Sequence, residues 1–251
     1  MRQGMNNVKL EFKNIRGHCY RVFLESRDIG MISFYKNKFH TSTRHFCMDL
    51  STYDVGFAQE FGENMAALAH KSLQIMVESD QKEKICFLEA AGFQCKRKCY
   101  EIEVAETNLV NQIRPDLPIR QCYAGEPLYL ACVKLLYHYY QDTHNEISPL
   151  TATFQEFSEV VPKMAYYIQE AGAIQQAIFV EDDELAYCCC LDEKKFGNFA
   201  AEVLGEMYSH YSNIFFEADD CDRAAMSLLG LFQINLPNSH NTYIREGTEI
   251  Q

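Results

Sequence analysis

The first fifty residues alternate apolar and polar positions in four short runs. Each run carries β-branched or aromatic residues: VKLEFKNI, HCYRVFLES, GMISFYKN and RHFCMDLS. A period of two places alternate side chains on opposite faces of a strand. Residues 8–51 are therefore predicted to form a four-stranded meander.

The pattern then changes to helical spacing. In residues 57–70, FAQEFGENMAALAH, apolar side chains recur every three to four positions and predict an amphipathic helix. The nearly continuous apolar run 73–79 predicts a buried strand. Residues 81–91 predict a second helix, ended by Gly92, and 94–104, QCKRKCYEIEV, alternate again as a strand.

The second half repeats this kind of alternation between helices and strands. Helical spacing predicts helices over 128–141, 153–171, 196–211 and 220–232, and β-type runs predict strands over 175–182, 184–192, 214–219 and 241–246. The strands 175–182 and 184–192 are close enough for a hairpin around Asp182 and Asp183.

The regular pattern is interrupted between Ala105 and Pro127, where three prolines and a glycine occur. A stretch rich in proline and without a regular pattern is typical of a boundary between domains. We therefore expect an N-terminal domain at 1–105, a linker at 106–125 and a C-terminal domain at 126–251.

The two predicted domains end alike. Residues 77–94, VESDQKEKICFLEAAGFQ, align without a gap to 216–233, FEADDCDRAAMSLLGLFQ. The alignment superposes Glu78 on Glu217, and the elements follow in the same order, which favours a duplication. The identities are few, so chance agreement and two unrelated domains both stay open.

Composition narrows the function. The chain has 35 acidic against 23 basic residues, a formal charge of −12, which argues against a general nucleic-acid binder. The single Lys-Arg-Lys run is interpreted as the exposed face of a strand. An acidic surface is more compatible with a cationic or small polar substrate.

The eleven cysteines are scattered and odd in number, and we interpret them as reduced thiols. Cys188, Cys189 and Cys190 are consecutive in a predicted strand, so their side chains alternate and cannot converge on a metal. No metal is expected. Neither a secretory signal nor a membrane-spanning run is found, and we expect a soluble, cytoplasmic protein without membrane contact.

The stretch 87–104, FLEAAGFQCKRKCYEIEV, resembles the last helix and hairpin of the GNAT-type N-acetyltransferase superfamily, and GLFQ (230–233) stands at the matching place in the second half. The resemblance implies an α/β (α+β) class, with two degenerate GNAT-like domains in tandem. Each would have a mixed, largely antiparallel sheet flanked by helices. It also implies acetyl-CoA as co-substrate, with its diphosphate held at a helix N-terminus.

The family's phosphate loop has two imperfect counterparts. TYDVGFA in the first half supplies Gly56 and Ala58, but Tyr53 replaces the usual basic or amide residue. EKKFGNFA in the second half supplies the candidate cofactor-binding residues Lys194, Lys195, Gly197 and Asn198. A glycine at a helix start also serves as an ordinary turn or cap, so this alternative stays open for both loops.

Acyl transfer to an ammonium requires a group that accepts its proton. Glu217 and Asp219, at the end of the strand IFFEAD, are the best-placed candidate catalytic residues. The alternative is that Asp219 or Asp220 caps the following helix. The tyrosine that the family often carries as an acid is missing, because Leu88 and Ser227 occupy its positions.

The sequence therefore predicts an acetyl-CoA-dependent N-acetyltransferase that acts on a small-molecule or peptidic amine by direct transfer. A homodimer is a compatible assembly. The competing hypothesis is a catalytically degenerate GNAT-like module that binds a ligand or a protein, since neither phosphate loop is intact.

Overall fold

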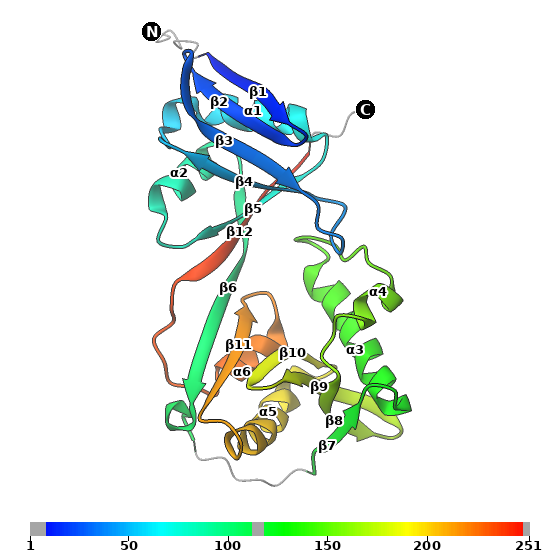
Figure 1. The fold of residues 1–251 in the computed structure, drawn as a ribbon. Helices are drawn as coiled ribbons and strands as arrows, with labels where there is room; N and C mark the ends of the chain where they lie inside the picture. The colour runs from blue at the N-terminus through cyan, green and yellow to red at the C-terminus, as the bar shows by residue number, and fades with distance from the viewer. Residues whose placement is uncertain (1–8, 112–117, 248–251) are drawn as a thin grey trace. The chain divides into compact units, whose positions relative to one another are not determined.

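A computed structural model describes residues 9–111 and 118–247 (Figure 1). Its contacts divide the chain into two compact units. The first unit consists of the residues up to Lys96 together with those from His240 onward, and the second unit spans Arg97–Ser239.

The first unit contains one sheet with the strand order β1-β2-β3-β4-β5-β12. Its elements are β1 (Leu10–Arg16), β2 (Cys19–Leu24), β3 (Arg27–Tyr35), β4 (Arg44–Leu50), η1 (Val55–Phe57), α1 (Ala58–Ala69), β5 (Leu73–Glu78), α2 (Lys82–Ala90) and β12 (Ser239–Arg245). The meander β1–β4 is antiparallel, as predicted, and both predicted helices are confirmed. Phe61 of α1 packs on Phe87 of α2, with ring centroids 5.1 Å apart, and this contact joins the helices in the core.

The second unit has the strand order β6-β11-β10-β9-β8-β7. Its elements are β6 (Gln94–Ala105), η2 (Glu106–Asn108), β7 (Arg120–Tyr123), α3 (Pro127–His144), α4 (Phe154–Ser158), β8 (Met164–Glu170), β9 (Ala173–Glu181), β10 (Glu184–Cys190), α5 (Glu193–Tyr208), β11 (Asn213–Asp219) and α6 (Arg223–Leu229). The predicted hairpin is confirmed by the antiparallel pairing of β9 with β10. Cys188–Cys190 are buried in β10, as expected for strand residues.

Each unit contains one parallel strand pair that soon separates. β4 and β5 pair only at Arg44–Leu73 and the next position, and β10 and β11 pair only at Glu184–Phe215 and the next position. Beyond these residues the strands diverge toward their carboxyl ends. A gap opened in this way leaves backbone and side chains accessible to a ligand.

The strand that follows the last helix of each half completes the sheet of the other unit. β6, which follows α2, pairs with β11 over seven residues. β12 follows α6 and pairs with β5 over six residues. β5 and β11 thus hold equivalent positions, each between a parallel and an antiparallel neighbour, which supports the predicted duplication.

The predicted helix over 153–171 is wrong. The helical part ends within α4, because the chain turns before Pro162, which has no amide hydrogen to donate in a helix. The remainder, MAYYIQE, forms β8 between β7 and β9. Its aromatic and β-branched residues favour a strand.

The predicted linker 106–125 is partly structured. It contains η2 and β7, and the Gln233 amide donates to the Asn108 carbonyl at 2.8 Å. Residues 112–117 of this linker lie outside the described residues. The contacts divide the chain at other residues than the predicted boundaries, because β6 packs with the second unit and β12 with the first. The two ancestral halves, 1–105 and 126–251, stay a prediction.

Across residues 9–111 and 118–247, none of the helices combines the length and apolar character needed to span a lipid bilayer.

Candidate active site in the second unit

A cavity of about 250 Å³ lies where β10 and β11 separate. Its walls come from β6, β10, β11, α3 and the start of α6. Both predicted catalytic residues, Glu217 and Asp219, line it.

Strand alternation gathers the charged residues on one face of the sheet. Asp219 is the register partner of Cys99, and Arg97 lies two residues earlier on the same face of β6. On the opposite face of β11, Phe216 packs against Phe232 just after α6, at a centroid distance of 5.8 Å. The charged face is therefore the one that α3, and not α6, approaches.

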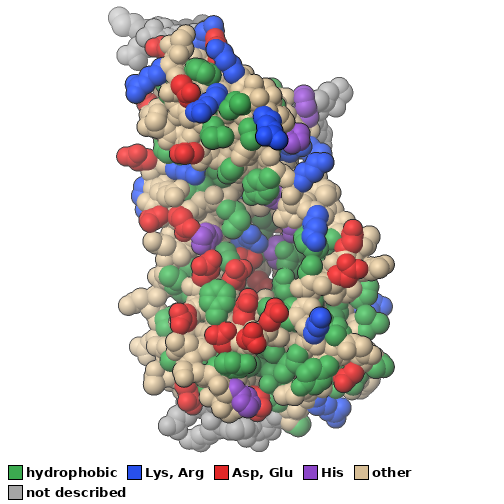
Figure 2. All heavy atoms as spheres, in the orientation of Figure 1, with side chains coloured by type: hydrophobic (Ala, Val, Ile, Leu, Met, Phe, Trp, Pro, Cys, Tyr) green, Lys and Arg blue, Asp and Glu red, His purple; other side chains and the backbone are tan. Residues whose placement is uncertain are grey.

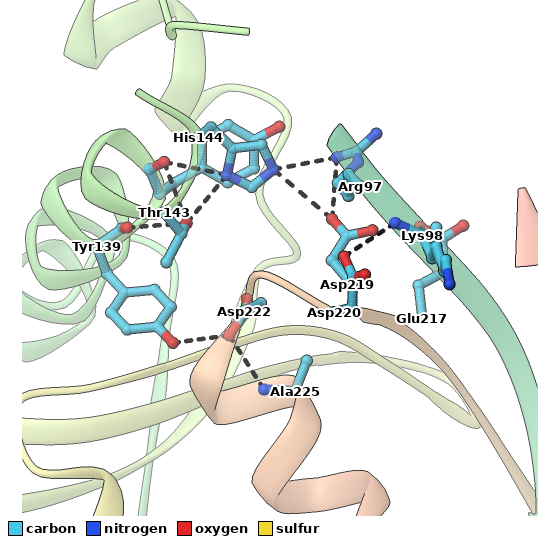
Figure 3. Close-up of polar contacts among 12 residues, drawn as sticks. Arg97, Lys98, Tyr139, Thr143, His144, Glu217, Asp219, Asp220, Asp222 and Ala225 are labelled. Carbon is cyan, nitrogen blue, oxygen red and sulfur yellow. Dashed lines mark hydrogen bonds and ion pairs between the residues drawn. The ribbon is translucent and has the colours of Figure 1, made fainter. Parts of the chain in front are cut away.

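Arg97, Asp219 and His144 form the polar centre of the cavity (Figure 3). The Arg97 Nη1 donates to Asp219 Oδ2 at 2.9 Å, and the side chains are only 16% and 17% exposed. His144 Nε2 lies 3.7 Å from the same oxygen. Burial raises the pKa of Asp219, but His144 and Arg97 outweigh it, so the net pKa is below its ordinary value. Asp219 is consequently an anion near neutral pH and a poor proton acceptor.

Three contacts position the His144 ring. His144 Nε2 lies 3.2 Å from Arg97 Nη1. His144 Nδ1 lies 3.1 Å from the Tyr140 carbonyl oxygen. Tyr140 also stacks on the imidazole, with centroids 3.8 Å apart. These contacts hold the ring in a fixed orientation.

Helix α6 is capped by Asp222. Its Oδ1 accepts from the amides of Ala224 and Ala225 at 2.9 and 3.1 Å. The alternative that Asp219 or Asp220 caps this helix is therefore wrong. Asp220 instead accepts from the Lys98 amide at 2.9 Å. With the cap supplied by another residue, the Asp219 carboxylate is directed to the cavity.

A hydrogen bond joins α3 to the start of α6 in the wall of the cavity. The Tyr139 hydroxyl donates to Asp222 Oδ1 at 2.7 Å (Figure 3). It also accepts from the Ala224 amide at 2.9 Å. Burial and the Asp222 charge raise the pKa of Tyr139 well above its ordinary value. Tyr139 is thus a fixed neutral donor inside the cavity.

Glu217 is the carboxyl group of the cavity that is best suited to accept a proton. Partial burial raises its pKa, and the nearby carboxylates of Asp219 and Glu101 raise it further. Glu101 is its direct register partner on β6, so two like charges oppose each other. Figure 2 shows Asp and Glu side chains gathered on the visible side of the second unit. A carboxylate in such a field binds a proton or a cation more readily.

The second predicted phosphate loop forms the start of α5. Asp192 caps this helix and accepts from the Lys194 amide at 3.0 Å. Lys194 and Asn198 are exposed, whereas Lys195 has an ion pair with Glu170 at 3.5 Å. Beside Gly197 the nearest atom to an added Cβ would be 4.0 Å away, so no close backbone approach requires a glycine there. These four residues do not line the cavity that holds Glu217.

The first predicted phosphate loop forms η1 and the start of α1. The Gly56 amide donates to Asp54 Oδ1 at 2.8 Å, and Ala58 is fully buried. A cavity of about 660 Å³ lies nearby, between the ends of β4 and the start of α2. Tyr53 and Lys84 line it, but Gly56 and Ala58 do not.

Both loops thus carry an aspartate carboxylate at the amides where a diphosphate would bind. An anion at a helix N-terminus gains from the exposed amides and the helix dipole, and a carboxylate already there competes with it. Lys194 and the exposed first turn of α5 are compatible with a diphosphate. The Asp192 charge opposes it, so the fit to CoA is partial.

Sequence reasoning missed several cavity residues: Arg97, Tyr139, His144 and Asp222. For Arg97 a signal existed, because alternation in 94–104 places it on the face of the buried Cys99 and opposite to Lys96 and Lys98. The spacing of Tyr140 and His144 places them on one helix face, but only the tertiary fold brings that face to Asp219. In the described part of the chain, no group of three or more metal-ligating side chains could hold a metal ion.

A mixed sheet with a parallel pair that splays open, covered by helices, is the fold of the GNAT N-acetyltransferases, and the chain has this fold. This chain is similar to a GCN5-related N-acetyltransferase from Sphaerobacter thermophilus. The superposed region covers 91% of this chain and 80% of that protein, at 10% sequence identity and a TM-score of 0.52. It is also similar to a functionally unknown conserved protein from Staphylococcus epidermidis. Here the superposed region covers 98% of this chain and 99% of that protein, at 12% sequence identity and a TM-score of 0.50. No protein-family model and no curated protein matches the sequence. Identities this low establish the fold alone.

Proposed function

We propose that the protein is an acetyl-CoA-dependent N-acyltransferase whose active site is the cavity between β10 and β11. The observation that carries the proposal is the position of Glu217, a carboxyl group with a raised pKa at the point where the parallel strands separate. The similarity to the GNAT fold supports acyl transfer in such a gap, where the resemblance implies that the cofactor lies.

Glu217 and Asp219 have different roles in the proposed reaction. Glu217 accepts the proton that an ammonium acceptor must lose before its nitrogen can attack. Asp219 stays charged, because Arg97 lowers its pKa, and it attracts the cationic acceptor. The acceptor is a small-molecule or peptidic amine. When bound, acetyl-CoA would supply the acyl group as its thioester, and CoA would leave as the thiol when the amide bond forms.

The decisive experiment compares equivalent residues of the two units. Glu217→Gln is expected to lower the rate of product formation from acetyl-CoA and an amine panel by roughly 10²-fold or more, as for loss of a general base. Glu78→Gln, the aligned change in the first unit, is expected to leave the rate unchanged. Product is measured by mass spectrometry. Equal losses in both variants, or no product from the native protein, would contradict the proposal.

A second candidate is a non-catalytic binding module, favoured by the Asp54 and Asp192 carboxylates at the two loops. Thermal unfolding separates the two functions, because a ligand that binds only the native state must raise the melting temperature. An enzyme is expected to show an upward shift with acetyl-CoA and with CoA. Lys194→Ala/Lys195→Ala should weaken that shift if α5 holds the diphosphate. The absence of any shift would favour the binding module.

A further inference from the structure

The first unit has another cavity, of about 470 Å³, at the loop between β3 and β4. It lies at the opposite end of β4 from the 660 Å³ cavity, and the two share no lining residue. Arg44 and Leu50 mark the two ends, about 20 Å apart for six residues of strand. This second cavity is therefore distinct from both gaps between parallel strands.

Its lining is strongly cationic. Lys36, Lys38, Arg44 and Lys71 line it, and no carboxyl side chain does so among the described residues. We call it the basic cavity. In residues 9–111 and 118–247, none of these four cations has an ion pair with a carboxylate. In a chain of net charge −12, four uncompensated cations around one hollow are an unusual concentration of positive charge.

Arg44 is held in place before any ligand binds. Its Nη2 donates to His18 Nδ1 at 3.1 Å, and its guanidinium lies 5.4 Å from the centroid of the Phe34 ring. Its buried Nε has no hydrogen-bond partner within the described part of the chain. A preorganised guanidinium with an unused donor loses little entropy when it binds an oxyanion.

The loop that carries the lysines is also fixed. Lys71 Nζ donates to the Thr41 carbonyl at 2.9 Å, and the Phe39 amide donates to Asn37 Oδ1 at 2.9 Å. The Arg44 amide donates to the Ser72 carbonyl at 2.7 Å, which ties the start of β4 to the residue before β5. The cationic groups therefore surround a defined space.

We propose that the basic cavity binds the phosphate group of a phosphorylated small molecule. A phosphate offers several oxygen acceptors and up to two negative charges, which match an arginine fork and three ammonium groups. The volume exceeds that of a phosphate alone, and Tyr35 presents an exposed ring for the organic part of the ligand. The overall negative charge of the protein disfavours a long polyanion such as nucleic acid.

Calorimetric titration with pyrophosphate and with inorganic phosphate, at an ionic strength held constant with potassium chloride, tests this site. Saturable binding of pyrophosphate is expected. Lys36→Gln/Lys38→Gln should weaken it by roughly tenfold or more, because two charge-assisted contacts are lost. Both lysines are exposed, so the melting temperature of this variant is expected to equal that of the native protein. Arg44→Lys keeps the charge without the fork and should have an intermediate affinity.

The matched control is Lys13→Gln/Arg16→Gln, which removes the same charge from exposed positions of β1 that do not line the cavity. This control should change the affinity for pyrophosphate less than twofold, because salt screens the interaction between the ligand and distant exposed charges. The proposal is overturned if the native protein shows no saturable binding, if the control loses as much affinity, or if RNA displaces pyrophosphate at a lower concentration. Acetyl transfer should be unaffected by the loop variant, so failure here is separate from failure of the proposed enzyme function.

Discussion

The two gaps between parallel strands have the same backbone plan and different contents. In each, the strands pair at only two positions, and an Asp-capped segment follows the first strand. The β10–β11 gap holds the buried Arg97–Asp219 pair and a helix that packs over it. The β4–β5 gap has Asp80, the aligned counterpart of Asp219, exposed and without an ion pair among the described residues. Two units with the same strand geometry can thus differ in whether the gap holds an ion pair.

The largest expected difference concerns Asp219. Asp219→Ala leaves the Arg97 guanidinium buried without its anion, and it should lower the free energy of unfolding by about 3 kcal/mol or more. Asp80→Ala should cost less than about 0.5 kcal/mol, because it removes an exposed carboxylate. Urea denaturation monitored by circular dichroism measures both. Arg97→Met/Asp219→Ala should recover part of the loss, and similar costs at the two positions would refute the contrast.

The next contrast concerns the Tyr139 hydroxyl, which joins α3 to the start of α6. Tyr139→Phe deletes one donor to Asp222 and one acceptor for the Ala224 amide, so unfolding should become easier by about 1–2 kcal/mol. Tyr53→Phe in the first unit removes only a 3.4 Å contact with the Leu50 amide and should cost a few tenths, about 0.3 kcal/mol. The same denaturation experiment applies, and a larger loss for Tyr53→Phe would reverse the comparison.

The two helix caps offer a smaller contrast that depends on the proposed function. Asp192→Ser keeps a capping oxygen and removes its charge, which should raise the affinity for CoA by roughly two- to fivefold. Asp54→Ser should leave the affinity unchanged if only the second unit holds the diphosphate. Calorimetry with CoA measures the change. An increase for Asp54→Ser alone would move the diphosphate to the first unit.

The smallest expected effect is the pH dependence of stability. The folded-state pKa of Glu217 is raised above 4.5, so its ionisation opposes folding increasingly as the pH rises above 4.5, and fully once the pH exceeds the raised value. Glu217→Gln should therefore be slightly more stable than the native protein at pH 7, and this advantage should vanish as the pH falls below about 4.5.

Asp219 should show the opposite sign, because its folded-state pKa is lowered below 3.8. Its stabilisation is present above 3.8 and is lost as the pH falls through the lowered value. Asp219→Asn should accordingly be less stable than the native protein at neutral pH, and most of this difference in stability should disappear only in strong acid. Denaturation midpoints across a pH series distinguish the two, and parallel curves for both variants would contradict the assignment.

The fold was largely predictable because most elements follow their local pattern. The meander β1–β4 alternates with a period of two, and α1 and α5 have clear apolar faces, so pattern and tertiary structure agree. The segment 153–171 misled because its apolar spacing fits a helix until Pro162, and only pairing with β7 and β9 decides that MAYYIQE is a strand.

The site was less predictable because its members are far apart in the sequence. Glu217 and Asp219 could be selected as acids at a strand end, but the lowered pKa of Asp219 depends on His144 and Arg97. Those partners come from β6 and α3, and no local rule pairs them with β11. The capping residue was misplaced by two or three positions for a similar reason, since α6 begins after a turn that the sequence does not mark.

The exchange of final strands determines when each sheet can be finished during synthesis. β5 leaves the ribosome about 165 residues before β12, which must pair with it, so one edge of the first sheet stays unprotected until β12 emerges. An open strand edge is a template for pairing with other chains. Folding of the first unit is therefore limited by a contact of very long sequence separation, and residues 1–96 alone lack the strand that closes this edge.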